Sequence, residues 1–134
     1  MRIKAIVEKS EDGLYSVYSE DHFGLSYLGG FGDNVSKAKK DFMLSVSEAL
    51  SEQEDKEVYV PSIEDIVVEF HYDLPSFFNC FDIINVSKFA KYAGINESKM
   101  RAYKNGLSFP GEKTTEKIAK AISQLGKELS AASL

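Results

Sequence analysis

The segment from Asn85 to Gly106 constrains this chain most, because its residues predict two short helices joined by a tight turn. Asn85 or Ser87 can cap the first helix, and Gly94 can adopt the positive φ that ends it. Asn96 can then cap the second helix. This spacing is typical of a DNA-binding helix-turn-helix, and a plain helical hairpin is the alternative interpretation.

The two faces of this helix pair differ in character. Residues spaced three or four apart share one face of a helix, so the apolar residues predict a buried side. The expected buried residues are Phe89, Ala90, Ala93, Ile95, Met100 and Tyr103. The expected outward residues are Ser98, Arg101, Ala102 and Asn105. The outward face is polar and positive, and narrow enough for a major groove.

Charge divides the chain into two parts. From Met1 to Phe81 there are 7 Lys and Arg residues against 16 Asp and Glu residues, a net charge of −9. From Asp82 to Leu134 there are 9 against 5, a net charge of +4. We therefore expect an acidic domain at residues 1–81 and a basic, all-α domain at residues 82–134, within an α+β protein.

The acidic part predicts the order β-β-β-α-β. Apolar residues alternate in four segments, which predicts strands, and Gly13 suits a hairpin turn between the first two. The predicted strands are Met1–Ser10, Leu14–Ser19, Gly24–Phe31 and Asp65–Asp73, with Glu20–His22 as a polar link. The Gly29-Gly30 pair indicates a bulge or a close backbone approach. The run that follows lacks the Lys-Ser/Thr ending of a phosphate loop.

Helices complete the prediction. Asp33 or Asn34 can cap a long helix that continues towards Glu57, with its lysines Lys37, Lys39 and Lys40 on the solvent side. Its expected buried stripe is Val35, Ala38, Phe42, Val46, Ala49 and Leu50. A short helix should begin at Leu74-Pro75. After a loop from Leu107 to Lys113, Thr114 or Thr115 should open the last helix.

Catalytic or metal sites are not expected. Cys80 is the single cysteine, no Cys/His cluster has zinc-ligand spacing, and the flanks of Cys80 offer no basic partner. His71 should point outward from its strand. A nuclease with two metal ions is the enzymatic alternative, but the acidic residues are scattered. We expect a cytoplasmic protein without cofactor, metal or membrane segment.

The basic part resembles the Cro/C1-type (Xre-like) helix-turn-helix. The likeness rests on FAKYAGINESKMRAYKNG, on the loop with Pro110 and on the helix TTEKIAKAISQLGKEL, and it covers Asp82 to Leu129. It implies that Glu97, Ser98 and Ala102 face base edges. We further expect Ser87, Lys88 and Lys113 to hold phosphates and Ser98, Lys99, Arg101 and Asn105 to face the groove of an operator duplex.

The acidic part resembles the head of HicB antitoxins, a partial ribonuclease H-like fold. The likeness rests on KAIVEKSEDGLYSVYSED and GGFGDNVSKAKKDFMLSVSEAL, and it covers Met1 to roughly Tyr72. It implies a small basic HicA-type toxin as partner, repression of the chain's own operon and a homo-oligomer, a dimer or a tetramer. A regulator of a phage or mobile element, with a dimerising or ligand-binding head and no toxin, is the alternative.

Overall fold

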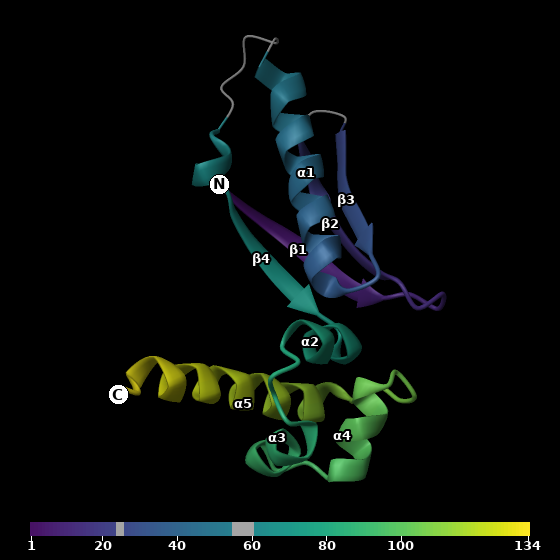
Figure 1. Cartoon of the computed structure of the whole chain (residues 1–134), viewed down its shortest axis with the longest axis vertical. Coiled ribbons are helices and arrows are strands. Elements are labelled where there is room, and N and C mark those ends of the chain that lie inside the picture. The colour runs from purple at the N-terminus through teal and green to yellow at the C-terminus, as the bar shows by residue number, and fades with distance from the viewer. Residues whose placement is uncertain (24–25, 55–60) are drawn as a thin grey trace. The chain divides into compact units, whose positions relative to one another are not determined.

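The computed structural model describes residues 1–23, 26–54 and 61–134, and it shows a mixed α+β protein (Figure 1). In these residues a four-stranded sheet occurs with five α-helices. The chain divides into two compact units, Met1–Cys80 and Phe81–Leu134. The division lies one residue before the predicted boundary after Phe81.

The first unit is built on a mixed sheet. Its strands are β1 (Arg2–Lys9), β2 (Tyr15–Phe23), β3 (Ser26–Gly32) and β4 (Val67–Tyr72). Their order in the sheet is β3-β2-β1-β4, with β2 antiparallel to β1 and β3, and β4 parallel to β1. Gly13 has a φ of 85° in the turn between β1 and β2, as its position predicts.

Strand β2 is longer than predicted, because Glu20–His22 continues the strand instead of forming a polar link. The ladder shifts register between Ser19 and Phe23, and side chains bond to the backbone there. Ser19 Oγ donates to the Lys4 carbonyl over 2.6 Å, and the Lys4 N–H donates to Asp21 Oδ2 over 3.1 Å. The predicted start of the third strand, Gly24, lies outside the described residues.

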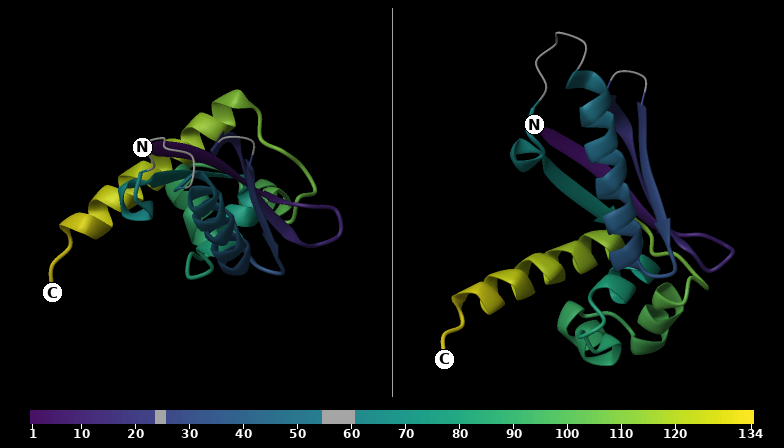
Figure 2. Two further views of the ribbon diagram at one scale, coloured as in Figure 1. Left: turned by 90° about the horizontal axis from the view of Figure 1, so that it is seen from above. Right: turned by 45° about the horizontal axis from the view of Figure 1, so that its top comes forward.

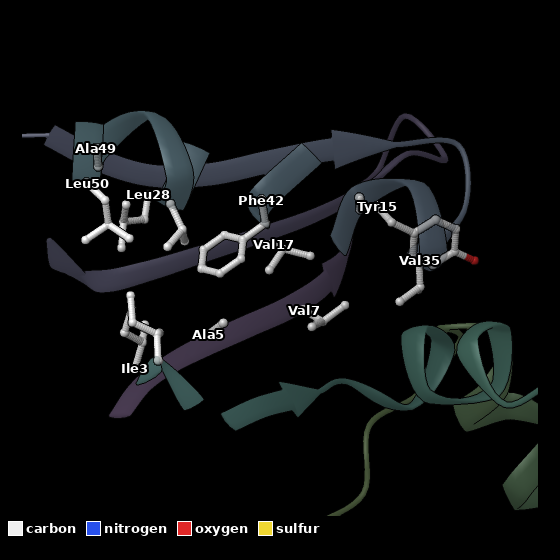
Figure 3. Packing of buried hydrophobic residues seen from close by; sticks show 13 residues of the cluster. Ile3, Ala5, Val7, Tyr15, Val17, Leu28, Val35, Phe42, Ala49 and Leu50 are labelled. Atoms are coloured by element: carbon white, nitrogen blue, oxygen red, sulfur yellow. The ribbon is translucent and has the colours of Figure 1, made fainter. Parts of the chain in front are cut away.

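Helix α1 (Val35–Glu54) covers one face of this sheet, mainly over β3 and β2 (Figures 1 and 2). Asn34 is the cap, since its Oδ1 accepts the Lys37 N–H over 2.8 Å. The predicted apolar stripe is confirmed, because all six of its residues are buried against β1, β2 and β3 (Figure 3). Residues 55–57 of the predicted helix lie outside the described part.

The helix approaches β3 at two glycines. A Cβ at Gly30 would lie 2.3 Å from the Phe42 nitrogen, and one at Gly32 would lie 2.6 Å from the Ala38 nitrogen. No side chain fits at such distances. Within the Gly29-Gly30 pair, Gly30 therefore marks a close backbone approach, one of the two predicted alternatives.

Strand β4 leads into helix α2 (Leu74–Cys80), which begins at Leu74-Pro75 as predicted. Val68, Phe70 and Tyr72 pack against the core. Glu69 and His71 are exposed, which confirms the predicted faces of β4. The predicted solvent-facing position of Lys39 is wrong, because this side chain is half-buried. Its Nζ lies 4.3 Å from the Phe70 ring centre, donates to the Tyr72 hydroxyl and lies 3.6 Å from Cys80 Sγ.

These contacts form a cluster of Lys39, Phe70, Tyr72 and Cys80 in the first unit. The Lys39 ammonium lies over the Phe70 and Tyr72 rings, and the electrons of an aromatic face attract a cation, more strongly when both are partly desolvated. Burial, and then the neighbouring Cys80, raise the pKa of the Tyr72 phenol. The sequence neighbours of Cys80 offer no basic group, but the fold supplies one from α1.

The second unit contains three helices, α3 (Val86–Ala93), α4 (Glu97–Lys104) and α5 (Glu112–Ala131). The predicted start of the last helix is wrong, because Gly111 is its cap and Glu112 its first residue. Thr115 Oγ1 donates to the Gly111 carbonyl over 2.9 Å, so this hydroxyl sits inside the first turn. A carboxylate in that turn also suits the positive end of the helix dipole.

Replacing Gly30 with Ala should destabilise the first unit by about 1 to 3 kcal/mol, because the new methyl group forces α1 away from β3. Gly29→Ala is the matched control, since its Cβ would meet the Val17 carbonyl oxygen at an ordinary 3.6 Å. That variant should change the free energy of unfolding by less than about 0.5 kcal/mol. Urea unfolding followed by circular dichroism measures both, and equal losses would contradict the close packing.

Candidate nucleic-acid interface

Helix α3 has a cap residue at each end, Asn85 before it and Gly94 after it, and each hydrogen-bonds to the backbone of the helix. The Asn85 Oδ1 accepts the Lys88 N–H over 2.9 Å, so Asn85 rather than Ser87 is the cap. Gly94 has a φ of 73°, and its N–H donates to the Lys91 carbonyl over 3.1 Å. Because this left-handed conformation is costly for other residues, Gly94 sets where the turn begins.

Helix α4 follows at once and has the same kind of start. The Asn96 Oδ1 accepts the Lys99 N–H over 3.1 Å. Met100 and Tyr103 are buried in the second unit with Phe89 and Ala90, as their spacing predicts. Gly106, with a φ of 72°, follows the cap residue Asn105 and ends the helix. The rotation of α4 is therefore fixed by its apolar side, and its other side faces solvent.

Arg101 lies at the centre of the solvent side. Its Nη1 donates to Ser87 Oγ over 3.4 Å and its Nη2 donates to Ser98 Oγ over 3.2 Å. These bonds link the start of α3 to the first turn of α4. The guanidinium has five N–H donors, so these two bonds leave donors for an acceptor outside the protein.

Glu97 is balanced by two cations. Its carboxylate lies 3.4 Å from Lys91 Nζ and 4.0 Å from Arg101 Nη1. Both pairs are at the surface, so they contribute little to stability. Their main effect is on the local potential, because they offset the one negative charge among the predicted contact residues.

The predicted contact residues lie on both short helices and at the start of α5. Lys88, Ser98, Lys99, Arg101, Asn105 and Lys113 are exposed, and Ser87, Glu97 and Ala102 are half-buried. Lys113 was expected in the loop, but it lies in the first turn of α5. The structure brings Ser87, Ser98 and Arg101 into direct contact.

Helix α5 supplies contacts that the sequence interpretation missed. Lys117 Nζ donates to the Gly94 carbonyl over 3.2 Å, where the end of α3 carries negative partial charge. The Tyr92 hydroxyl donates to Glu128 Oε2 over 2.8 Å. Partial burial, then this hydrogen bond and the charge of Glu128, raise the pKa of Tyr92. Both contacts join residues far apart in sequence, so no local sequence pattern predicts them.

The charge of this unit favours an anionic ligand. Residues 81–134 contain 9 Lys and Arg residues against 5 Asp and Glu residues.

Among the described residues, no three His, Cys, Asp or Glu side chains gather where they could hold a metal ion.

Comparisons with protein-family models, with curated proteins and with solved structures find no significant match. In the described parts of the chain, no helix is both long enough and apolar enough to span a membrane.

Substituting Ala for Asn96 should lower the stability of the second unit by about 1 kcal/mol, because the Lys99 N–H loses its acceptor. Asn105→Ala is a suitable control, since Asn105 is exposed in right-handed helical conformation at the other end of α4. Denaturant unfolding of the full chain measures the difference. A loss for Asn105→Ala as large as that for Asn96→Ala would contradict the capping role.

Proposed function

We propose that this chain is a DNA-binding transcriptional regulator of the antitoxin type. The observation that carries the proposal is Arg101, which stands exposed on α4 and is held by Ser87 and Ser98. It lies on a helix whose opposite side is fixed by Met100 and Tyr103. A short helix with a rigid apolar back and a cationic front is suited to enter a major groove.

The contact residues divide into two roles. Lys88, Lys99 and Lys113 carry charges suited to phosphate oxygens, which fix the position of a protein on the duplex. Arg101 can donate two bonds to the O6 and N7 atoms of a guanine, and the Ala102 methyl can contact a thymine methyl. Two copies would place their α4 helices about 34 Å apart, one turn of the duplex, on a palindromic operator.

The first unit is proposed to bind a basic protein. Residues 1–80 contain 7 Lys and Arg residues against 16 Asp and Glu residues, so their net charge is −9. Opposite charge accelerates association and favours the correct partner. A small basic toxin that cleaves messenger RNA fits this chemistry, and the acidic unit would block its RNA-binding surface. The second candidate is a phage or mobile-element regulator without a toxin, in which the first unit joins copies of the chain.

Arg101→Ala should weaken binding to a duplex carrying the region upstream of the chain's own gene by about 1 to 3 kcal/mol, since a bidentate base contact is lost. Lys127→Ala is the matched control, because it removes a positive charge near the far end of α5. Gel-shift titrations at one salt concentration compare the variants. Equal affinities for Arg101→Ala and the wild-type chain would remove Arg101 from the interface.

Co-expression with the product of a neighbouring reading frame that encodes a short basic protein should give a complex. The complex should co-purify through a tag on this chain and dissociate as salt rises, because its attraction is electrostatic. Purification from cells expressing the tagged chain alone is the control. Failure to co-purify would contradict the toxin-binding role and favour the regulator without a toxin.

A further inference from the structure

We propose that the outer edge of β4 pairs with β4 of a second copy of this chain, antiparallel and around a two-fold axis at Phe70. The proposal concerns the first unit alone and does not depend on DNA or toxin binding. It starts from the two edges of the sheet, which are formed by β3 and β4. An unprotected edge strand offers unpaired backbone groups to another strand.

The β3 edge is protected by its own helix. The Gly29 N–H donates to Ser45 Oγ over 3.1 Å, and the Phe31 N–H donates to Asp41 Oδ2 over 2.9 Å. Ser45 and Asp41 both belong to α1. Side chains of α1 therefore occupy backbone donors that an additional strand would need.

On the β4 edge, Val68 and Phe70 have no such protection among the described residues. The Val67 N–H donates to the Met1 carbonyl over 2.8 Å, and the Asp73 N–H donates to the Val7 carbonyl over 3.1 Å. Backbone groups alternate in direction along a strand, so those of Val68 and Phe70 point away from β1. Among the described residues, none is paired with the Val68 or Phe70 backbone on that side.

An apolar groove lies beside this edge. Helix α1 packs mainly on β3 and β2, which leaves the inner face of β4 less covered (Figures 1 and 2). The groove has a volume of about 760 Å³, and its lining is mainly apolar, with Met43 and Leu44 of α1 and Ile66, Val68 and Phe70. Lys39, Lys40 and Ser47 of α1 complete the lining. Leu44 is 60% exposed. A second sheet joined at β4 would cover part of this groove, and removing apolar surface from water is favourable.

Charge selects the register. A two-fold axis at Phe70 puts Phe70 opposite its counterpart and Glu69 opposite His71 of the second copy, a pair in which the imidazole can donate a hydrogen bond to the carboxylate. An axis at Glu69 would set two carboxylates against each other. Glu69 and His71 are exposed on the outer face and lie 3.0 Å apart within one chain, and Arg2 lies 3.4 Å from the other carboxylate oxygen of Glu69, so the pairing would exchange contacts within the chain for contacts between copies.

Two features within the first unit favour the pairing. Helix α2 follows β4 directly, and it turns back to contact β1 and α1 of its own unit. The edge from Val67 to Tyr72 carries no proline and no lysine, two residues that proteins use to block such edges.

Disulfide trapping tests the register in the full chain. Glu69→Cys and His71→Cys variants, each with Cys80→Ser, should form a disulfide-linked dimer when mixed and oxidised, because facing residues lie within disulfide reach. Each variant alone should form far less. No cross-link in the mixture, or an equal cross-link of Glu69→Cys alone, would overturn the proposed pairing.

A proline variant tests the hydrogen bonds. Val68→Pro removes an N–H that points away from β1, so the unit should stay folded while the dimer dissociation constant rises about ten- to hundredfold. Tyr27→Pro, the matched control on the β3 edge, should leave that constant unchanged. Analytical ultracentrifugation measures association, and circular dichroism checks folding. A folded Val68→Pro variant that associates like the wild-type chain, or a wild-type chain that stays monomeric, would overturn the proposal.

Discussion

The contact between α1 and β3 is the constraint on which the first unit depends. The helix backbone lies so near the strand that Gly30 and Gly32 have no space for a side chain. Such contact brings Phe42 and Val46 of α1 fully into the core. It also draws the helix to one side of the sheet, so that β3 is well covered and β4 is not. The position of α1 over β3 therefore accounts both for the dense packing at β3 and for the exposed groove beside β4.

The second unit obtains its geometry from capping rather than from a large core. Asn85 and Asn96 satisfy the first backbone donors of α3 and α4, and Gly94 fixes the turn between them. Because the helices are short, their directions depend strongly on these ends. Arg101 then joins the two helix starts through hydroxyl groups, which limits the positions of its guanidinium before any ligand arrives.

Local chemistry explains which predictions the structure confirms. Alternating apolar residues, the asparagine caps and the positive φ of Gly13 and Gly94 follow from short-range rules, so the strands and most helix starts could be predicted. Tertiary contacts explain the differences. Strand β2 continues through Glu20–His22 because Asp21 reaches Lys4 on another strand. Lys39 is half-buried because β4 brings Phe70 and Tyr72 beneath it.

The site residues were predictable only to the level of a helix face. Spacing put Ser98 and Arg101 on the exposed side of α4, and both are exposed. Their hydrogen bond, and the bond from Arg101 to Ser87, depend on side-chain rotamers and on the angle between two helices. The link from Lys117 to Gly94 crosses 23 positions of sequence and follows from tertiary packing.

The donors that Ser45 and Asp41 occupy on β3 have a consequence for assembly size. Strand addition that used both edges could continue from copy to copy and end in a fibre. With β3 closed by its own helix, joining two copies at β4 uses up the available edges and leaves the same closed strand at each outer boundary. In the proposed pairing the result would be a finite particle with two-fold symmetry, in which strand addition stops at the second chain.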